Sequence, residues 1–153
     1  MEFKTETGNF PILVVEDSPE DFEATERAIH WLNIPNPVIN CEDTDSALDY
    51  LFQRGQYSEP GAAPRPGIVI LDLNLPGNGG LEVLTAAKSD PDLRAIPIIV
   101  FSSSYDEQEI QNCYRAGANS YIKKPMSSEQ FLATIQQIRA YWFKLAILPS
   151  TQV

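Results

Sequence analysis

The sequence lacks the features of membrane, secreted and nucleic-acid-binding proteins. No apolar run reaches the roughly 18 residues that a helix needs to span a bilayer. The first residues, MEFKTETGNFP, lack the basic and then apolar order of a signal peptide. Basic residues are few, since 11 Lys and Arg stand against 21 Asp and Glu, for a formal net charge of −10. Because phosphate backbones repel such a chain, we expect no direct binding to DNA or RNA.

Cysteine is also scarce. The two cysteines, Cys41 and Cys113, each lie inside an apolar-periodic segment, which predicts buried thiols in a reducing cytoplasm rather than a disulfide framework. No repeat or low-complexity tract occurs, and 153 residues with 43% hydrophobic content fit one globular domain. We therefore expect a single cytoplasmic domain over residues 1–153, with its core at about 10–140.

Strand and helix patterns alternate along the chain. The strand segments are PILVVE, PVINC, IVIL, IPIIVF and SYIKK, and helix-spaced apolar residues follow each of them, such as Leu81, Leu84 and Ala87 after IVIL. Five strand–helix units predict right-handed crossovers and a five-stranded parallel sheet covered on both faces, an α/β doubly wound fold. The Gly- and Pro-rich stretch 54–66 predicts an exposed loop.

Two serines are expected to begin helices. Ser18 precedes Pro19 and has Asp21 three residues later, and Ser127 has Gln130 three residues later. Both patterns are typical of N-terminal helix caps.

Polar side chains follow the predicted strands at their carboxyl ends, where doubly wound folds bind ligands. They are Glu16 and Asp17 after the first strand, Asp72 after the third, Ser102 and Ser103 after the fourth, and Lys123 and Lys124 after the fifth. In the strand order 2-1-3-4-5, the first and third strands are neighbours about 4.8 Å apart. Three carboxylates this close need a cation or a raised pKa, and oxygen ligands suit Mg²⁺. Taken singly, Asp17 and Asp72 are equally compatible with capping loops.

This set of side chains supports phosphoryl transfer to a carboxylate. Asp72 can take a phosphoryl group as an aspartyl phosphate, a transfer that depends on neutralising charge on the phosphoryl oxygens. Mg²⁺, the Lys124 ammonium and the Ser102 hydroxyl would each cover one oxygen. Lys123, one residue earlier in its strand, is expected to point to the other side as a surface charge.

Four motifs, VVEDS, LDLNLPGNGG, VFSSS and YIKKP, occur in this order along residues 10–140 and resemble those of response-regulator receiver domains. The resemblance implies a flavodoxin-like receiver fold with Asp72 as the phosphoacceptor and Ser102 and Lys124 as its partners. It implies that Mg²⁺ is held by Glu16, Asp17, Asp72 and the backbone carbonyl of Asn74. It also implies a cis peptide between Lys124 and Pro125.

The resemblance implies a switch as well. In this family an aromatic residue three before the lysine, here Tyr121, swings into the space left when the hydroxyl of Ser102 is drawn toward the phosphoryl group. The face built from the fourth helix, fifth strand and fifth helix then changes shape. The alternative for Tyr121 is an ordinary aromatic side chain at the sheet edge.

The C-terminal segment FLATIQQIRAYWFKLAILPSTQV predicts an extended last helix with surplus apolar surface. One helical stripe contains Phe131, Ile135, Ile138, Trp142 and Leu145, and further apolar residues lie beyond it. A monomer seldom leaves such a patch uncovered. We expect a dimerisation extension at about 140–153, with an interface of Tyr141, Trp142, Phe143, Leu145, Ile147 and Leu148. The alternative is a tail folded back over its own domain.

The long loop 54–66 and this extension resemble the single-domain response regulators of cyanobacterial phytochromes. That resemblance implies a homodimer and a phytochrome histidine kinase as phosphodonor; the alternative is a receiver for another histidine kinase, of the chemotaxis or motility type. A phosphohydrolase with an aspartate nucleophile would carry D-x-D, whereas Asn74 gives DLN. A nucleotide-binding domain would need a glycine-rich phosphate loop, and G-x-x-x-x-G-K-[ST] is absent. We expect no enzymatic activity other than catalysis of its own phosphorylation and dephosphorylation.

Overall fold

The structure is a computed structural model that describes residues 10–77 and 79–149. The strands are β1 (Ile12–Val15), β2 (Val38–Cys41), β3 (Ile68–Leu71), β4 (Ile98–Ser102) and β5 (Ser120–Lys123). The helices are α1 (Pro19–Trp31), α2 (Thr44–Phe52), α3 (Gly80–Ser89), α4 (Glu107–Arg115) and α5 (Ser128–Ile138), with a 3-10 turn η1 (Gly55–Tyr57) and a π-helical segment η2 (Arg139–Leu145). Within the described ranges, no helix is long and apolar enough to cross a membrane.

The five strands form one parallel sheet in the order β2-β1-β3-β4-β5. This confirms the predicted α/β doubly wound fold and its strand order. Ile12 of β1 lies opposite Val38 of β2 on one side and Ile68 of β3 on the other. Since the strand order reverses at β1, the carboxyl ends of β1 and β3 flank the point where such sheets bind ligands.

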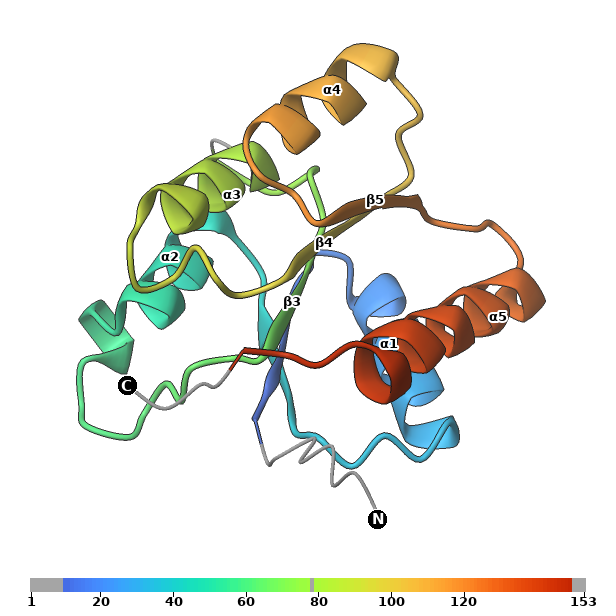
Figure 1. Cartoon of the computed structure of the whole chain (residues 1–153), viewed down its shortest axis with the longest axis horizontal. Helices are drawn as coiled ribbons and strands as arrows, with labels where there is room; N and C mark the ends of the chain where they lie inside the picture. Colours follow the sequence, from blue (N-terminus) through green and yellow to red (C-terminus); the bar gives the residue numbers. More distant parts are fainter. Residues whose placement is uncertain (1–9, 78, 150–153) are drawn as a thin grey trace.

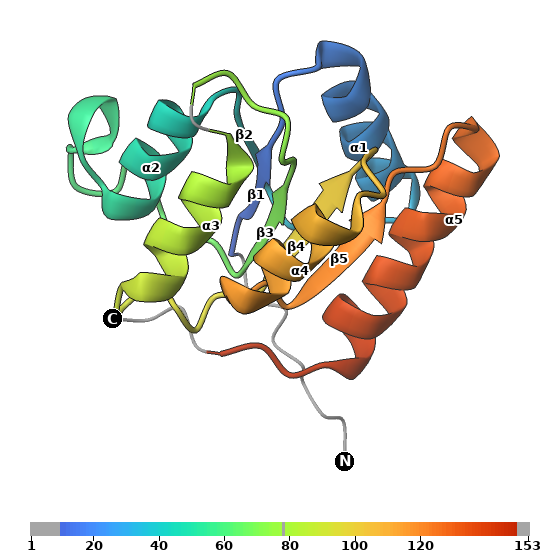
Figure 2. The same cartoon turned by 90° about the horizontal axis from the view of Figure 1, so that it is seen from above.

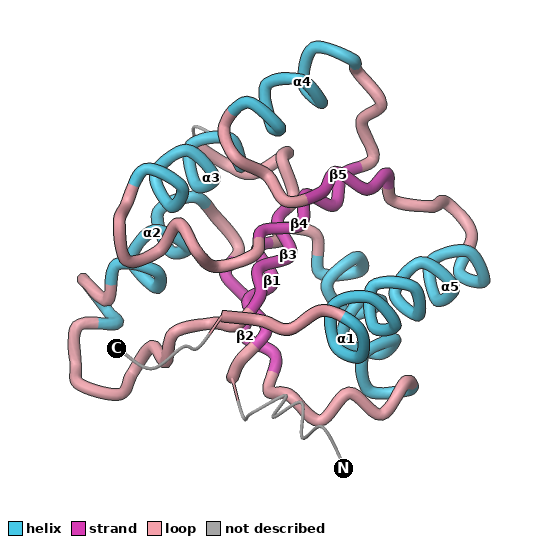
Figure 3. The backbone as a smooth tube through the Cα atoms, viewed as in Figure 1, coloured by secondary structure: helices cyan, strands magenta, loops and turns pink. Residues whose placement is uncertain are grey.

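Helices cover both faces of the sheet, so the central strands are apolar on both sides. Because successive side chains of a strand point to opposite faces, Leu13 and Val15 pack with α2, α3 and α4, whereas Ile12 and Val14 pack with α1 and α5. Figure 1 shows the strands between these two helix layers, and Figure 2 gives the same arrangement from above. The strands lie at the centre of the molecule in Figure 3, with the loops around them.

The two predicted helix caps are present. The hydroxyl of Ser18 accepts a hydrogen bond from the Asp21 amide at 3.3 Å, and that of Ser127 accepts one from the Gln130 amide at 3.2 Å. Each cap satisfies an amide that has no partner within the helix. The Ser18 cap fixes the start of α1 directly after the acidic residues that follow β1.

The inward face of α3 differs in part from the prediction. Its buried residues are Gly80, Val83, Leu84 and Ala87, so Leu84 and Ala87 are confirmed. Leu81 lies off this face, and its side chain is 38% exposed. The apolar spacing was compatible with either set, and the close approach of Gly80 to the loop after β3 selects the observed one.

The loop 54–66 is exposed over most of its length, as predicted, but it is tied to α2 at its far end. Ala63 is buried, the Tyr50 hydroxyl donates to the carbonyl of Pro64 at 2.7 Å, and the Gln53 side chain donates to the carbonyl of Ala63 at 2.9 Å. These bonds hold the loop against the domain.

The last helix extends past α5, as predicted, but its spacing changes. In a π-helix hydrogen bonds join residues five apart, and Phe143 lies five residues after Ile138. Both are buried, Phe143 to 7% exposure, and the Phe143 ring stacks on Phe10 with centroids 6.2 Å apart. Leu145 is 72% exposed. The wider turn thus places Phe143, rather than Leu145 of the predicted stripe, on the buried face, so Phe143 lies in the core of its own protomer and not on the surface expected for a dimer interface.

Beyond Leu145, the chain leaves the α5 layer and crosses toward the side of the sheet covered by α2 and α3 (Figures 1 and 2). Along this stretch Ile147 is exposed and Leu148 is half-buried. The tail thus folds partly over its own domain while still presenting apolar side chains to solvent.

The packing of the C-terminal segment can be tested with Phe143→Ala. Removing a buried ring that stacks on Phe10 should lower the free energy of unfolding by about 3 kcal/mol. Leu145→Ala is the matched control, because its exposed side chain should change stability by no more than about 0.5 kcal/mol. Urea denaturation of dilute protein measures both; equal losses would contradict the observed π-helical packing.

Candidate functional site

An acidic cluster lies at the carboxyl ends of β1 and β3. Glu16 and Asp17 follow β1, Asp72 follows β3, and one carboxylate oxygen of each lies within 4.8 Å of those of the other two. Glu16 and Asp72 are buried, whereas Asp17 is exposed. The neighbouring positions of β1 and β3 bring Glu16 and Asp17 close to Asp72, which is 56 and 55 positions later in the sequence, as the strand order predicted.

The backbone holds Asp72 rigidly. Its amide donates to the carbonyl of Val15 at 3.0 Å, which extends the β1–β3 pairing by one residue, and its Oδ1 accepts the Asn74 amide at 3.1 Å. Gly80 packs directly against this loop, since a Cβ there would lie 2.2 Å from the Asp72 carbonyl oxygen. Only glycine fits at that distance, which explains one of the glycines after Asp72.

Lys124, the residue directly after β5, reaches into the cluster. Its Nζ donates to Asp72 Oδ2 and to Asp21 Oδ2, each at 2.9 Å, and also to Glu16 Oε1. The Lys124 amide donates to the Ser102 carbonyl at 2.8 Å, which fixes the start of this side chain. Lys124 is buried among these partners, so its charge is fully engaged in the site.

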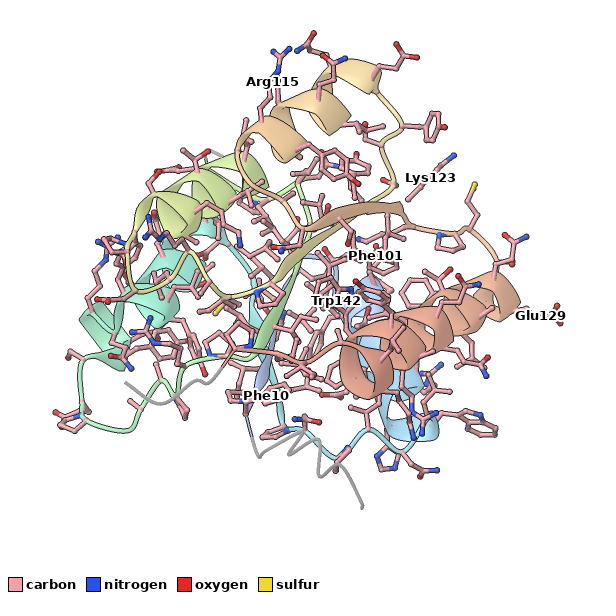
Figure 4. All side chains as sticks on the ribbon, viewed as in Figure 1. Phe10, Phe101, Arg115, Lys123, Glu129 and Trp142 are labelled. Carbon is pink, nitrogen blue, oxygen red and sulfur yellow. The ribbon has the colours of Figure 1, made fainter. Side chains whose placement is uncertain are left out.

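Lys123 points the other way, as predicted. Its Nζ lies 5.5 Å from the centroid of the Tyr105 ring, and its side chain projects into solvent (Figure 4). The alternation along β5 therefore assigns the two lysines to different roles.

The charges in the site are strongly coupled. Burial and, after it, the neighbouring Asp72 carboxylate raise the pKa of Glu16 to about 9, against the opposing effect of Lys124. Burial also raises the pKa of Asp72, but Glu16, Lys124 and the Asn74 amide together hold it below its usual value. Burial lowers the pKa of Lys124, yet its bonds to Glu16 and Asp72 outweigh this and raise it. At neutral pH, Asp72 is ionised, Lys124 is charged and Glu16 holds a proton.

Asp21 is a site residue that the sequence interpretation missed. It was assigned to the cap of α1, a position its backbone amide does occupy. Its carboxylate, however, turns back to Lys124. A signal was available, because the first turn of the helix after β1 must lie beside the carboxyl ends of the strands, where Lys124 also ends.

The predicted switch residues lie on the β4 side of the site. Ser102 is fully buried, and its Oγ accepts the Ser104 amide at 3.3 Å. The hydroxyl of Tyr121 donates to the Ser104 carbonyl at 2.8 Å, and the Tyr121 amide donates to the Tyr114 hydroxyl at 3.0 Å. Ser104 Oγ donates to Glu109 of α4. Hydrogen bonds thus run from Ser102 to β5 and α4.

The donor set fits a hard divalent cation. The cluster offers only oxygen atoms, and Glu16 Oε2 is buried with no hydrogen-bond partner among the described residues. A buried carboxylate oxygen of this kind needs either a proton or a cation. Asp17 provides an exposed carboxylate on the open side, so a cation could keep part of its water shell. The backbone amide of Asn74 donates to Asp72, so Asn74 lies next to the cluster. The predicted contact between its backbone carbonyl and a cation is not tested by this bond.

The predicted cis peptide before Pro125 is wrong, because no cis peptide occurs among the described residues. The sequence could not decide this point, since the two isomers of an X–Pro bond differ by only about 0.5–1 kcal/mol.

Comparison with known proteins gives a consistent result. The response regulator receiver domain family matches residues 12–136. Response regulator Rcp1 of Synechocystis sp. (strain ATCC 27184 / PCC 6803 / Kazusa) is 33% identical over 139 residues, which cover 91% of this chain and 92% of the relative. The probable methanogenesis regulatory protein FilR2 of Methanothrix harundinacea (strain 6Ac) is 36% identical, over 87% of this chain and 83% of the relative.

Two solved structures of response regulators are similar to this chain over most of its length. The phosphorylated cyanobacterial phytochrome response regulator RcpA is 36% identical with a TM-score of 0.87, covering 94% of this chain and all of the other. The Mn²⁺-bound form of Rcp1 is 33% identical with a TM-score of 0.86, over 92% and 99% of the two chains. The motif order, the strand order and the matched length therefore assign this chain to the response regulator receiver domain family.

Proposed function

We propose that this protein accepts a phosphoryl group on Asp72 from a sensor histidine kinase, and that this kinase is a phytochrome. The observation that supports Asp72 as the phosphoacceptor is its position. It is an ionised carboxylate at the end of a central strand, 2.9 Å from the Lys124 ammonium and beside two further acids. The kinase class is supported by two relatives, RcpA and Rcp1, the former described as a cyanobacterial phytochrome response regulator.

The transfer itself makes modest covalent demands on the protein. An Asp72 oxygen forms a bond to phosphorus while the bond from phosphorus to the kinase histidine breaks, and the imidazole nitrogen keeps the electron pair. What the site must supply is charge neutralisation on the phosphoryl oxygens. Lys124 already bonds to Asp72 and can shift to one of these oxygens. Ser102 can donate its hydroxyl to a second.

The cation in this proposal is Mg²⁺. Glu16, Asp17, Asp72 and the Asn74 backbone carbonyl would hold it, and when bound it supplies positive charge to a phosphoryl oxygen. A relative of this chain, Rcp1, has a structure in a Mn²⁺-bound form, which supports the proposal of a divalent cation here. We place the exchange in the cytoplasm, since both cysteines are free, buried thiols.

The switch follows from the hydrogen bonds around Ser104. When the Ser102 side chain moves so that its hydroxyl can donate to the phosphoryl group, its Oγ shifts relative to the Ser104 amide from which it accepts. Ser104 also accepts from Tyr121 and donates to Glu109, so a shift of the loop alters contacts with β5 and α4. In this proposal the face of α4, β5 and α5 reports phosphorylation to a partner protein.

The C-terminal extension is proposed to form a homodimer. Tyr141, Leu145 and Ile147 are 53%, 72% and 89% exposed, respectively, which is unusual for large apolar side chains so close together in the chain. Trp142 and Leu148 are half-buried and would lie at the margin of the interface. Phe143 belongs to the core of its own protomer and is left out.

The phosphoacceptor is tested by incubation with Mg²⁺ and acetyl phosphate, followed by intact mass measurement. The wild-type protein should gain one phosphoryl group, because Asp72 is ionised and lies in the acidic cluster that would hold the cation. Asp72→Asn should gain none, since an amide cannot form the acyl phosphate. Asp45→Asn, which changes an exposed acid in the first turn of α2, should behave as the wild type. A wild type that stays unmodified, or an Asp72→Asn variant modified equally, would overturn the proposal.

The raised pKa of Glu16 predicts an inverse pH dependence of stability in metal-free protein. Between its usual value of 4.5 and its folded value of about 9, the folded chain holds a proton that the unfolded chain has released. The free energy of unfolding should therefore fall as pH rises through this window, by up to about 1.4 kcal/mol per pH unit. Urea denaturation in EDTA at a series of pH values measures it.

Two variants isolate this effect. Glu16→Gln removes the titrating group and should flatten the pH profile, whereas Glu129→Gln, at an exposed position of α5 (Figure 4), should keep the wild-type slope. Mg²⁺ at about 100 times its Kd should stabilise the wild type by about 2.7 kcal/mol, and more readily at higher pH, because the cation must displace the Glu16 proton. A pH profile of metal-free wild type as flat as that of Glu16→Gln would refute the assignment.

The dimer is tested by sedimentation. The wild type should sediment as a dimer, and the double variant Leu145→Glu with Ile147→Glu should sediment as a monomer, because charges would be buried in the proposed interface. Trp31→Glu, at a 73% exposed aromatic residue on α1, is the control and should remain dimeric. Monomeric wild type at all workable concentrations, phosphorylated or not, would reject the interface.

A further inference from the structure

Asn40 is a polar residue on an otherwise apolar side of the sheet. It is the third residue of the edge strand β2, two positions after Val38, which packs with the α1–α5 side of the core. Successive side chains alternate along a strand, so Asn40 faces the same side. Its partner across the sheet is Val14 of β1, whose side chain is buried in that core.

The Asn40 amide bonds to the main chain at the end of β1. Its Nδ2 donates to the carbonyl of Val14 at 3.0 Å and to that of Glu16 at 3.2 Å. Both acceptors are carbonyl oxygens, which cannot donate, so only the NH₂ end of the amide can occupy this position. One side chain therefore joins two carbonyls on either side of the last residue of β1.

These bonds lie where the chain leaves the sheet. The paired register of β1 and β2 ends at Val15 and Cys41, and the Glu16 amide adds one bond to the Cys41 carbonyl at 2.9 Å. The Asn40 side chain then holds the Glu16 carbonyl, which precedes Asp17. The Asn40 side chain thus bonds the chain to β2 one residue beyond the end of β1. The residues held there, Glu16 and Asp17, bear two of the three clustered carboxylates.

We propose that Asn40 is a positioning residue for the divalent cation site. It touches neither the cation ligands' carboxylates nor the phosphoryl group. It acts by fixing the turn of Glu16 and Asp17, so that the carboxylates keep the spacing at which their oxygens meet those of Asp72. This inference rests on the cation site in the proposed function. Groups that orient metal ligands in this way commonly change metal affinity by 10- to 100-fold when removed.

The test is Mg²⁺ binding by titration calorimetry on the unphosphorylated protein. Asn40→Leu has a similar size and apolar neighbours in Val14 and Val38, but it cannot donate; we expect Mg²⁺ affinity to fall about tenfold. Asn36→Ala is the matched control. Its amide also donates to a main-chain carbonyl, that of Phe10 at 3.0 Å, but at the opposite end of the strands. This variant should bind Mg²⁺ as the wild type does, even where it melts at a lower temperature.

A second measurement separates positioning from general loss of structure. In an Asp17→Asn background, Asn40→Leu should weaken Mg²⁺ binding by less than it does alone, because the ligand on the turn has already been changed. Asn40→Ser, whose hydroxyl cannot reach both carbonyls, repeats the titration if Asn40→Leu does not fold. Circular dichroism at the titration temperature establishes the folded state of each variant.

The outcomes are distinct. If the wild type binds no Mg²⁺, the cation site of the proposed function fails. If the wild type binds and folded Asn40 variants bind equally well, only the role of Asn40 fails. If Asn36→Ala weakens binding as much as Asn40→Leu does, or the losses from Asn40→Leu and Asp17→Asn are additive, the effect is not one of positioning and the inference is overturned.

Discussion

The buried ammonium of Lys124 organises this end of the molecule. It bonds to carboxylates from the end of β1, the first turn of α1 and the end of β3, and its own backbone is tied to β4. A buried charge of this kind is tolerated only with its partners present, and loss of one partner typically costs about 3–5 kcal/mol. Parts of the chain from β1, α1, β3, β4 and the end of β5 must therefore come together before the site exists, which makes the site a consequence of the sheet order.

One lysine does not balance the acids around it. Glu16, Asp17, Asp21 and Asp72 would carry four negative charges, and burial acts strongly on two of them. The metal-free protein reduces the imbalance by keeping a proton on Glu16. A divalent cation would serve the same purpose and release that proton. In the proposed transfer, the same surplus of negative charge would require both a cation and Lys124 to neutralise the phosphoryl oxygens.

The sequence predicted the features that depend on the spacing of apolar residues and on the order of strands and helices. Apolar alternation identified the five strands, and the acids and lysine after them marked the site before any geometry was known. Features that depend on one local contact or one local change of helix type were not predicted. Asp21 has two uses, at a helix cap and at Lys124, and only the cap is visible in a pattern. Phe143 was predicted outside the helical stripe and Leu145 within it, whereas Phe143 is buried and Leu145 exposed, because a π-helical turn changes the spacing that the stripe assumed.

Polar residues that interrupt an apolar pattern are informative for the same reason. Asn40 lies in β2 on the α1–α5 side of the sheet, and Thr25 is buried in α1. Each donates to the carbonyl of a residue whose carboxylate bonds to Lys124. The Thr25 bond, at 3.0 Å to Asp21 four residues earlier, is common for threonine in a helix. The Asn40 bond joins different strands and has no such local cause. Where a side chain departs from the pattern of its strand to hold the backbone of a charged site, the departure itself indicates what the site requires.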